Sequence, residues 1–191
     1  MYKKQVKLQK LLCLMAIIVS AAVFIYSLGI ITDIYDTLYS TMRNPNDLTK
    51  TSVAGSFLYY EMQGFNQAFM LYGLAMILLS VGLFLTNTHS RRKYYIGNYI
   101  SVGLWCVAAV GGSVWSHIQI EAIKVKWLQI DFEALQKHAQ TFKSLYTEST
   151  FWLDLHYLIC VLLLVVTVLM VCNLVWKQKL MRKETALLAN S

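Results

Sequence analysis

Four long apolar runs that carry almost no charge constrain this chain more than any other feature of its sequence. The runs are residues 11–31, 68–86, 95–115 and 155–176. Each is about 20 residues long, and an α-helix of that length crosses a hydrocarbon core of roughly 30 Å. Of the 191 residues, 57% are apolar and 14% are charged, which is far from the balance of a soluble domain. We therefore predict an all-α integral membrane protein, a four-helix transmembrane bundle that forms a single domain over residues 1–191.

Basic residues gather at one set of ends of these runs. The segment before the first run, the loop after the second and the segment after the fourth hold 11 Lys and Arg residues against one acid, Glu184. The other two loops hold six basic residues against nine acids. Because basic residues are retained on the cytoplasmic side of a membrane, both termini are predicted to be cytoplasmic. Anionic lipid headgroups then account for the net charge of +7, and a nucleic-acid partner is not expected.

The two loops on the other side, residues 33–66 and 119–150, are predicted to extend helices beyond the membrane. In the first loop, Asn44–Asp47 breaks a helical pattern, and Thr51 or Ser52 can cap the helix that follows. In the second, apolar residues spaced 4-3-4-3-4 predict a heptad-like seam. The seam consists of Leu128, Phe132, Leu135, Ala139, Phe142 and Tyr146.

The seam needs an apolar partner, and two interpretations remain open. It can pack on the apolar stripe of the first loop, through Ile34, Leu38 and Met42, and form an extracytoplasmic cap. Alternatively, its far end can bind another protein, because exposed aromatic clusters on a small protein mark interaction sites. The second interpretation assigns partner binding to Leu135, Phe142 and Tyr146.

The third run differs from the others in its small residues, which let helix backbones approach closely in lipid. We expect it to be the central packing helix, through Gly103, Ala108, Ala109, Gly112 and Ser113. The fourth run consists of bulky apolar residues, and we expect it to face lipid or a partner helix. Asn98 and Asn173, near the cytoplasmic ends of the third and fourth runs, are expected to form hydrogen bonds between helices.

Chemistry-bearing residues are sparse. No ionisable side chain lies deep within a run, although ion sites and proton relays in membranes need one. His89, His117 and His138 are isolated along the chain, and Asp154 and His156, two residues apart on a helix, point to different faces. Asp154 is explained as an acid in the first turn of a helix. With no catalytic motif present, the sequence predicts no catalytic residue, no cofactor and no metal ligand.

This combination favours a non-catalytic accessory or scaffolding subunit of a larger plasma-membrane complex, such as a bacterial transporter. Its expected partners are other integral membrane subunits, an extracytoplasmic binding protein and the anionic lipids of the cytoplasmic face. Two alternatives remain open. One is a self-assembling small channel or carrier for apolar solutes. The other is a membrane enzyme acting near the outer interface, for which Glu61, Asp154 and His156 are the candidate groups.

Overall fold

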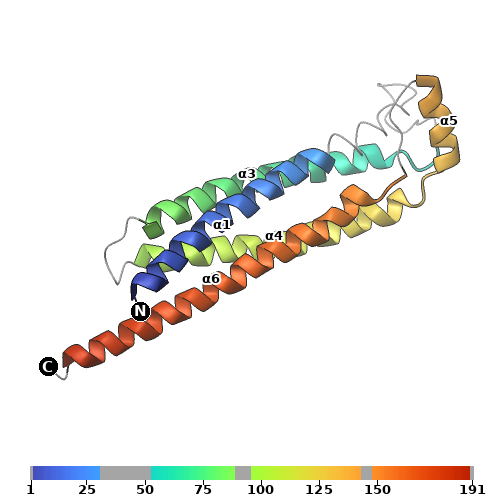
Figure 1. Cartoon of the computed structure of the whole chain (residues 1–191). Helices are drawn as coiled ribbons and strands as arrows, with labels where there is room; N and C mark the ends of the chain where they lie inside the picture. The colour runs from blue at the N-terminus through green and yellow to red at the C-terminus, as the bar shows by residue number, and fades with distance from the viewer. Residues whose placement is uncertain (1, 31–52, 89–95, 143–147, 190–191) are drawn as a thin grey trace. The chain divides into compact units, whose positions relative to one another are not determined.

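The computed structural model describes residues 2–30, 53–88, 96–142 and 148–189, and within these ranges all regular structure is helical. The helices are α1 (Tyr2–Gly29), α3 (Leu58–Thr88), α4 (Ile96–Trp127), α5 (Phe132–Phe142) and α6 (Phe151–Ala189) (Figure 1). All except α5 are long and apolar enough to cross a membrane. The prediction of an all-helical chain with four candidate membrane-spanning helices is therefore confirmed.

The four long helices continue well past the apolar runs that identify them. The largest extension is in α6, which has 39 residues and continues from the end of its run at Trp176 to Ala189. Its last turns contain Lys, Gln, Leu, Met, Arg, Glu and Ala and neither Gly nor Pro. Such residues have high helix propensity, so the helix persists although the sequence has become polar.

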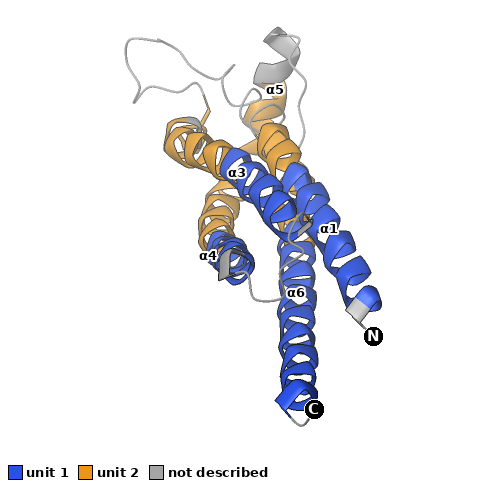
Figure 2. Ribbon diagram, turned by 90° about the vertical axis from the view of Figure 1, so that its left-hand side faces the viewer, with its two compact units in different colours: residues 1–22, 74–113, 159–191 blue, residues 23–73, 114–158 orange. Residues whose placement is uncertain are grey.

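The described chain forms two compact units (Figure 2). Unit 1 consists of residues 1–22, 74–113 and 159–191, and unit 2 consists of residues 23–73 and 114–158. The sequence predicted one domain over residues 1–191. Each of the four long helices contributes one part to each unit.

A chain of side-chain amides joins the four helix parts of unit 1. Asn173 of α6 donates a hydrogen bond to Gln9 of α1. Gln9 donates to Asn87 of α3 (3.0 Å), and Asn87 donates to Ser101 of α4 (3.2 Å). In the orientation that satisfies both ends of its amide, Asn98 of α4 donates to the backbone carbonyl of Thr86 (2.7 Å). The expectation that Asn98 and Asn173 form hydrogen bonds between helices is confirmed.

The small residues of the third run do not all face the same surroundings. Ala109, Gly112 and Ser113 are buried, whereas Ala108 is half-buried. Gly103 is exposed and has open space where a Cβ would lie. One side of this run is therefore packed, and the role of α4 as the central packing helix stays a prediction.

The packed interior of unit 2 is built on aromatic rings. Phe65, Phe69 and Tyr72 of α3 lie against Trp115 of α4, with ring centroids 5.5 to 6.1 Å apart. Tyr26 of α1 meets Phe69 edge-on at 5.8 Å. Its hydroxyl also donates a hydrogen bond of 2.7 Å to the backbone carbonyl of Trp152 in α6. These contacts hold the unit 2 parts of α1, α3, α4 and α6 together.

The residues of the predicted seam are divided between two helices and the turn that separates them. α4 ends at Trp127, a turn follows, and α5 begins at Phe132. Asp131 caps α5, because its carboxylate accepts a hydrogen bond from the backbone N–H of Ala134 (3.0 Å). Gly55 adopts a φ of 83° against this turn, where a Cβ would lie 3.0 Å from the Cα of Ile130. The cap and this close approach favour a turn over a continued helix.

The break changes the exposure of the seam residues. Leu128 lies in the turn and is 59% exposed, whereas Leu135 is fully buried within unit 2. Tyr146 and the side chains of Ala139 and Phe142 lie outside the described residues. The same holds for the predicted partner stripe of the seam and for the predicted break and cap, namely Ile34, Leu38, Met42, Asn44–Asp47, Thr51 and Ser52. Helix α3 begins at Leu58, after turns over residues 53–57. Partner binding at the far end of the seam stays a prediction, and Leu135 packs internally.

Candidate metal centre

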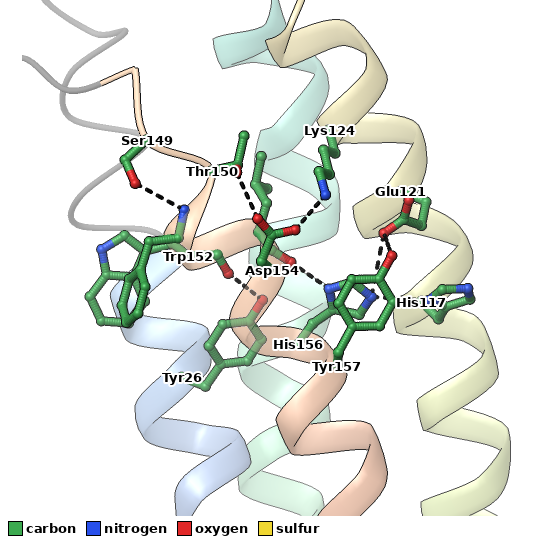
Figure 3. A network of polar contacts seen from close by, with 12 residues as sticks. Tyr26, His117, Glu121, Lys124, Ser149, Thr150, Trp152, Asp154, His156 and Tyr157 are labelled. Carbon is green, nitrogen blue, oxygen red and sulfur yellow. Dashed lines mark hydrogen bonds and ion pairs between the residues drawn. The ribbon is translucent and has the colours of Figure 1, made fainter.

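Three side chains that can ligate a metal ion converge within unit 2 (Figure 3). His117 and Glu121 lie four residues apart on α4, so they share one face of that helix. His156 comes from the beginning of α6. One ligand atom from each of the three residues lies within 4.8 Å of the other two.

The ring nitrogens of the two histidines approach closely. Nδ1 of His117 lies 3.0 Å from Nε2 of His156, and the same Nε2 lies 3.6 Å from a carboxylate oxygen of Glu121. In a tetrahedral zinc site with bonds of roughly 2.0–2.1 Å, neighbouring ligand atoms are about 3.3 Å apart. The two measured distances lie on either side of that separation. Two of the three distances are thus near those of a zinc site, and all three ligand atoms lie within 4.8 Å of one another.

A backbone contact orients the imidazole of His156. Its Nδ1 forms a hydrogen bond with the backbone carbonyl of Leu153. Because a carbonyl oxygen only accepts, Nδ1 must carry a proton, and in the neutral ring the lone pair is then on Nε2. That lone pair lies on the side of His117 and Glu121. This arrangement, in which a ligand histidine donates its other N–H to a backbone carbonyl, is the usual one in metal sites.

The carboxylate of Glu121 is oriented in a similar way. The hydroxyl of Tyr157 donates a hydrogen bond of 2.7 Å to it. The ring of Tyr157 also lies against both imidazoles, with centroids 4.0 Å from His156 and 5.7 Å from His117. Tyr157 thus contacts all three candidate ligands without contributing a ligand atom of its own.

Burial differs across the cluster and leaves it accessible from one side. His156 is only 1% exposed, whereas His117 is exposed and Glu121 is partly exposed. Nε2 of His156 accepts a hydrogen bond from His117 in the tautomer that has a proton on Nδ1 of His117, and Nε2 and the carboxylate oxygen of Glu121 are also both groups that a cation can bind. A metal cation satisfies both groups, and the exposed side at His117 provides a route for it to enter.

The charged residues next to the cluster form ion pairs with one another. Lys124 pairs with Asp154, whose other oxygen accepts a hydrogen bond from the hydroxyl of Thr150 (2.6 Å). Two residues further along α4, Lys126 pairs with Glu61 of α3. As predicted, Asp154 lies in the first turn of its helix. The expectation that Asp154 and His156 point to different faces is not confirmed, because both side chains contact residues of α4. Asp154 and Glu61 are therefore engaged with lysines and do not belong to the candidate ligand set.

The sequence-based interpretation of His117 as an isolated histidine is wrong. The four-residue spacing of His117 and Glu121 on a helix was a usable signal, because it places two ligand types on one face. No local pattern could add His156, because it lies 39 residues from His117 and on another helix. His89 and the side chain of His138 lie outside the described residues.

No protein-family model, no curated protein and no solved structure matches this chain. Its function is therefore inferred from the four long apolar helices and from the geometry of the cluster of His117, Glu121 and His156.

Proposed function

We propose that this chain is a multi-pass membrane protein that binds a divalent transition-metal ion through His117, Glu121 and His156. The observation that supports the proposal is the convergence of the three ligand atoms within 4.8 Å. Two imidazoles and one carboxylate are a donor set for Zn²⁺ and for non-haem Fe²⁺. We take Zn²⁺ as the first choice because it accepts this set in a tetrahedral site with one position open.

The charge asymmetry of the sequence supports a topology for this site. Unit 1 contains 11 basic residues and one acid, whereas unit 2 contains six basic residues and nine acids. With basic residues retained inside the cell, both termini are cytoplasmic and the metal site faces the outside of the plasma membrane. A site in that position takes its metal from the extracytoplasmic medium.

Within this topology, we propose that the protein acts as a non-catalytic accessory subunit of a larger membrane complex, such as a bacterial transporter. The metal would then tie α4 to α6 and stabilise the part of the chain that faces extracytoplasmic partners. The absence of ionisable residues deep within the apolar runs supports a role outside the transport path itself.

A metal-dependent membrane enzyme is the second candidate, and a specific observation favours it. Structural zinc sites use four protein ligands, whereas catalytic sites use three and leave one position for water. Among the described residues, three ligands converge, and His117 is exposed. A bound metal would lower the pKa of a water in the open position and could supply a hydroxide near the outer interface.

Metal analysis of the full-length protein tests the proposed site. The protein is purified in detergent with a tag that lacks histidine, stripped with a chelator and titrated with Zn²⁺. We expect about one high-affinity Zn²⁺ per chain, and a loss of on the order of 100-fold or more in affinity for Glu121→Gln and for His156→Ala. Titration with Co²⁺ should produce the visible absorption of a tetrahedral site in the parent and not in these variants.

The matched control is Asp154→Asn, which removes a carboxylate two residues from His156 that pairs with Lys124 instead. It should bind Zn²⁺ as tightly as the parent. A parent protein that binds no Zn²⁺, or ligand variants that bind it as well as the parent, would show that the cluster is an ordinary hydrogen-bonded group.

A further inference from the structure

An apolar groove lies between α3 and α4 within unit 1. It has a volume of about 470 Å³, which is within the range of roughly 300–1,000 Å³ that small-molecule sites occupy. Helix α3 lines it from Ala75 to Thr86, and α4 lines it with Ser101 and Leu104. All of these residues belong to the parts of α3 and α4 that are long and apolar enough to cross a membrane. In the membrane location proposed above, the groove therefore opens toward hydrocarbon and not toward water.

Small residues create this groove. Gly82 has open space where a Cβ would lie, and Ala75 adds only a methyl group. Leu83 is fully buried, whereas Leu78 of α3 and Leu104 of α4 are exposed. Exposed leucines from both helices thus flank a floor of small or buried residues.

Two hydroxyl groups lie at the end of the groove that is nearest the end of α3. Thr86 donates a hydrogen bond to the backbone carbonyl of Gly82 (2.9 Å), and Ser101 donates one to the backbone carbonyl of Asn98 (3.3 Å). The two hydroxyl oxygens are also 3.0 Å from each other. Because each hydroxyl has one proton, and protein acceptors already engage it, neither is left to donate to a ligand. The groove therefore suits a hydrocarbon ligand rather than one that needs hydrogen bonds.

The length of the groove matches one leaflet of a bilayer. Ala75 and Thr86 are separated by 11 residues of α3, which corresponds to about 16 Å. The hydrocarbon core of a bilayer is roughly 30 Å thick, so each leaflet supplies about half of that thickness. The groove begins near the middle of the apolar run 68–86 and reaches the end of that run. It therefore extends from the bilayer midplane to the level at which acyl chains meet the headgroups.

We propose that this groove binds one acyl chain of a phospholipid, with the headgroup end of the chain beside Thr86 and Ser101. A transmembrane helix of a partner is about 10–12 Å in diameter, whereas the axes of neighbouring helices are only about 8–10 Å apart, so a helix is too wide to enter the groove. An extended hydrocarbon chain is narrow enough to lie in it and makes van der Waals contacts along its length. The proposal depends on the membrane location and is independent of the metal site.

Photo-crosslinking in vesicles tests the proposal. The full-length protein is reconstituted in phosphatidylcholine vesicles that contain a trace of phosphatidylcholine with a diazirine in one acyl chain. After irradiation, the crosslinked residues are identified by peptide mass spectrometry. We expect the yield of crosslinks at the groove lining to be well above that at Leu164 and Val168 of α6. Those two residues are exposed within an apolar run and report random contact with the bilayer.

Filling the groove should displace the acyl chain. Gly82→Leu places a side chain in the open space at Gly82 and should lower the groove yield about fivefold, because the ligand loses its packing contacts. The yield at Leu164 and Val168 should not change. Leucine is a better helix former than glycine, so the variant should fold. The matched control Gly111→Leu adds the same side chain at an exposed position of α4 outside the lining and should crosslink like the parent.

Three outcomes would overturn the proposal. The first is an equal yield at the groove and at α6 in the parent, and the second is an unchanged groove yield in Gly82→Leu. The third is a lining protected from the lipid in a protein that Gly82→Leu converts from an oligomer to a monomer, which would place a second copy of the chain at the groove. Zn²⁺ affinity should be the same in Gly82→Leu and the parent, so a failure of this proposal is distinguishable from a failure of the metal site.

Discussion

Nδ1 of His117 lies 3.0 Å from Nε2 of His156, although 39 residues separate the two histidines in the chain. The distance links α4 to α6, two helices that are joined through a turn, α5 and a further connecting segment. The contact brings a pair of imidazoles beside the carboxylate of Glu121. Variants that change this contact, or the packing in unit 1, should change metal affinity or the free energy of unfolding.

Removing the hydroxyl of Tyr157 should weaken metal binding without removing a ligand. In Tyr157→Phe the ring stays against both imidazoles, but Glu121 loses the hydrogen bond that orients its carboxylate. Loss of such an outer contact typically lowers metal affinity roughly 10- to 100-fold. We therefore expect titration calorimetry to give a dissociation constant for Zn²⁺ that is about tenfold higher than that of the parent. The matched variant Tyr26→Phe loses a hydroxyl that donates to Trp152, away from the cluster, and should keep the parent affinity. Equal Zn²⁺ affinity of Tyr157→Phe and the parent would show that the Tyr157 hydroxyl does not contribute to metal binding.

Replacing Gln9 by Leu should destabilise unit 1. Gln9 accepts a hydrogen bond from Asn173 and donates one to Asn87, so its loss leaves two buried amides short of a partner. Hydrogen bonds between membrane helices contribute roughly 0.6–2 kcal/mol each, and we expect a loss of about 1–2 kcal/mol in the free energy of unfolding. The measurement is reversible unfolding in mixed micelles. Gln67→Leu makes the same change at an exposed position of α3 and should cost much less. A similar loss of unfolding free energy in both variants would mean that the hydrogen bonds of the amide chain do not stabilise unit 1.

Two adjacent glycines of α4 offer a test of close helix packing. Gly112 is buried, whereas Gly111 is exposed and has open space where a Cβ would lie. Gly112→Leu should lower the free energy of unfolding by about 1–3 kcal/mol, because a large side chain forces packed backbones apart. Gly111→Leu should have little effect on the same measurement. If the two variants unfold alike, α4 is not the central packing helix.

Cysteine labelling in intact cells tests the proposed topology. In a background without the four native cysteines, single cysteines are introduced at Asn46, Arg92 and Gln136. The charge asymmetry predicts that a membrane-impermeant reagent labels positions 46 and 136 from outside, whereas position 92 reacts only after the cells are opened. Labelling of position 92 in intact cells would reverse the orientation and place the metal site in the cytoplasm.

The candidate membrane-spanning helices could be predicted from the sequence because they depend on local properties. A run of about 20 apolar residues identifies a spanning helix wherever the rest of the chain lies. The same holds for Asp154, whose place in the first turn of α6 suits the helix dipole, and for Asn98 and Asn173, which are polar groups in apolar surroundings. Each of these inferences needs only the neighbouring residues.

The metal cluster, the break after Trp127 and the burial of Lys177 were decided by tertiary structure. The heptad-like spacing continues through the break, and only the cap at Asp131 and the approach of Gly55 to Ile130 end the helix there. Hydropathy along the chain places Lys177 among exposed basic residues, yet α4 covers it through Asn98 and Tyr99. Spacing along α4 pairs His117 with Glu121, but only the packing of α6 against α4 brings His156 to them. Periodicity reports which residues share a face of one helix, whereas the identity of the residues opposite that face depends on contacts between distant parts of the chain.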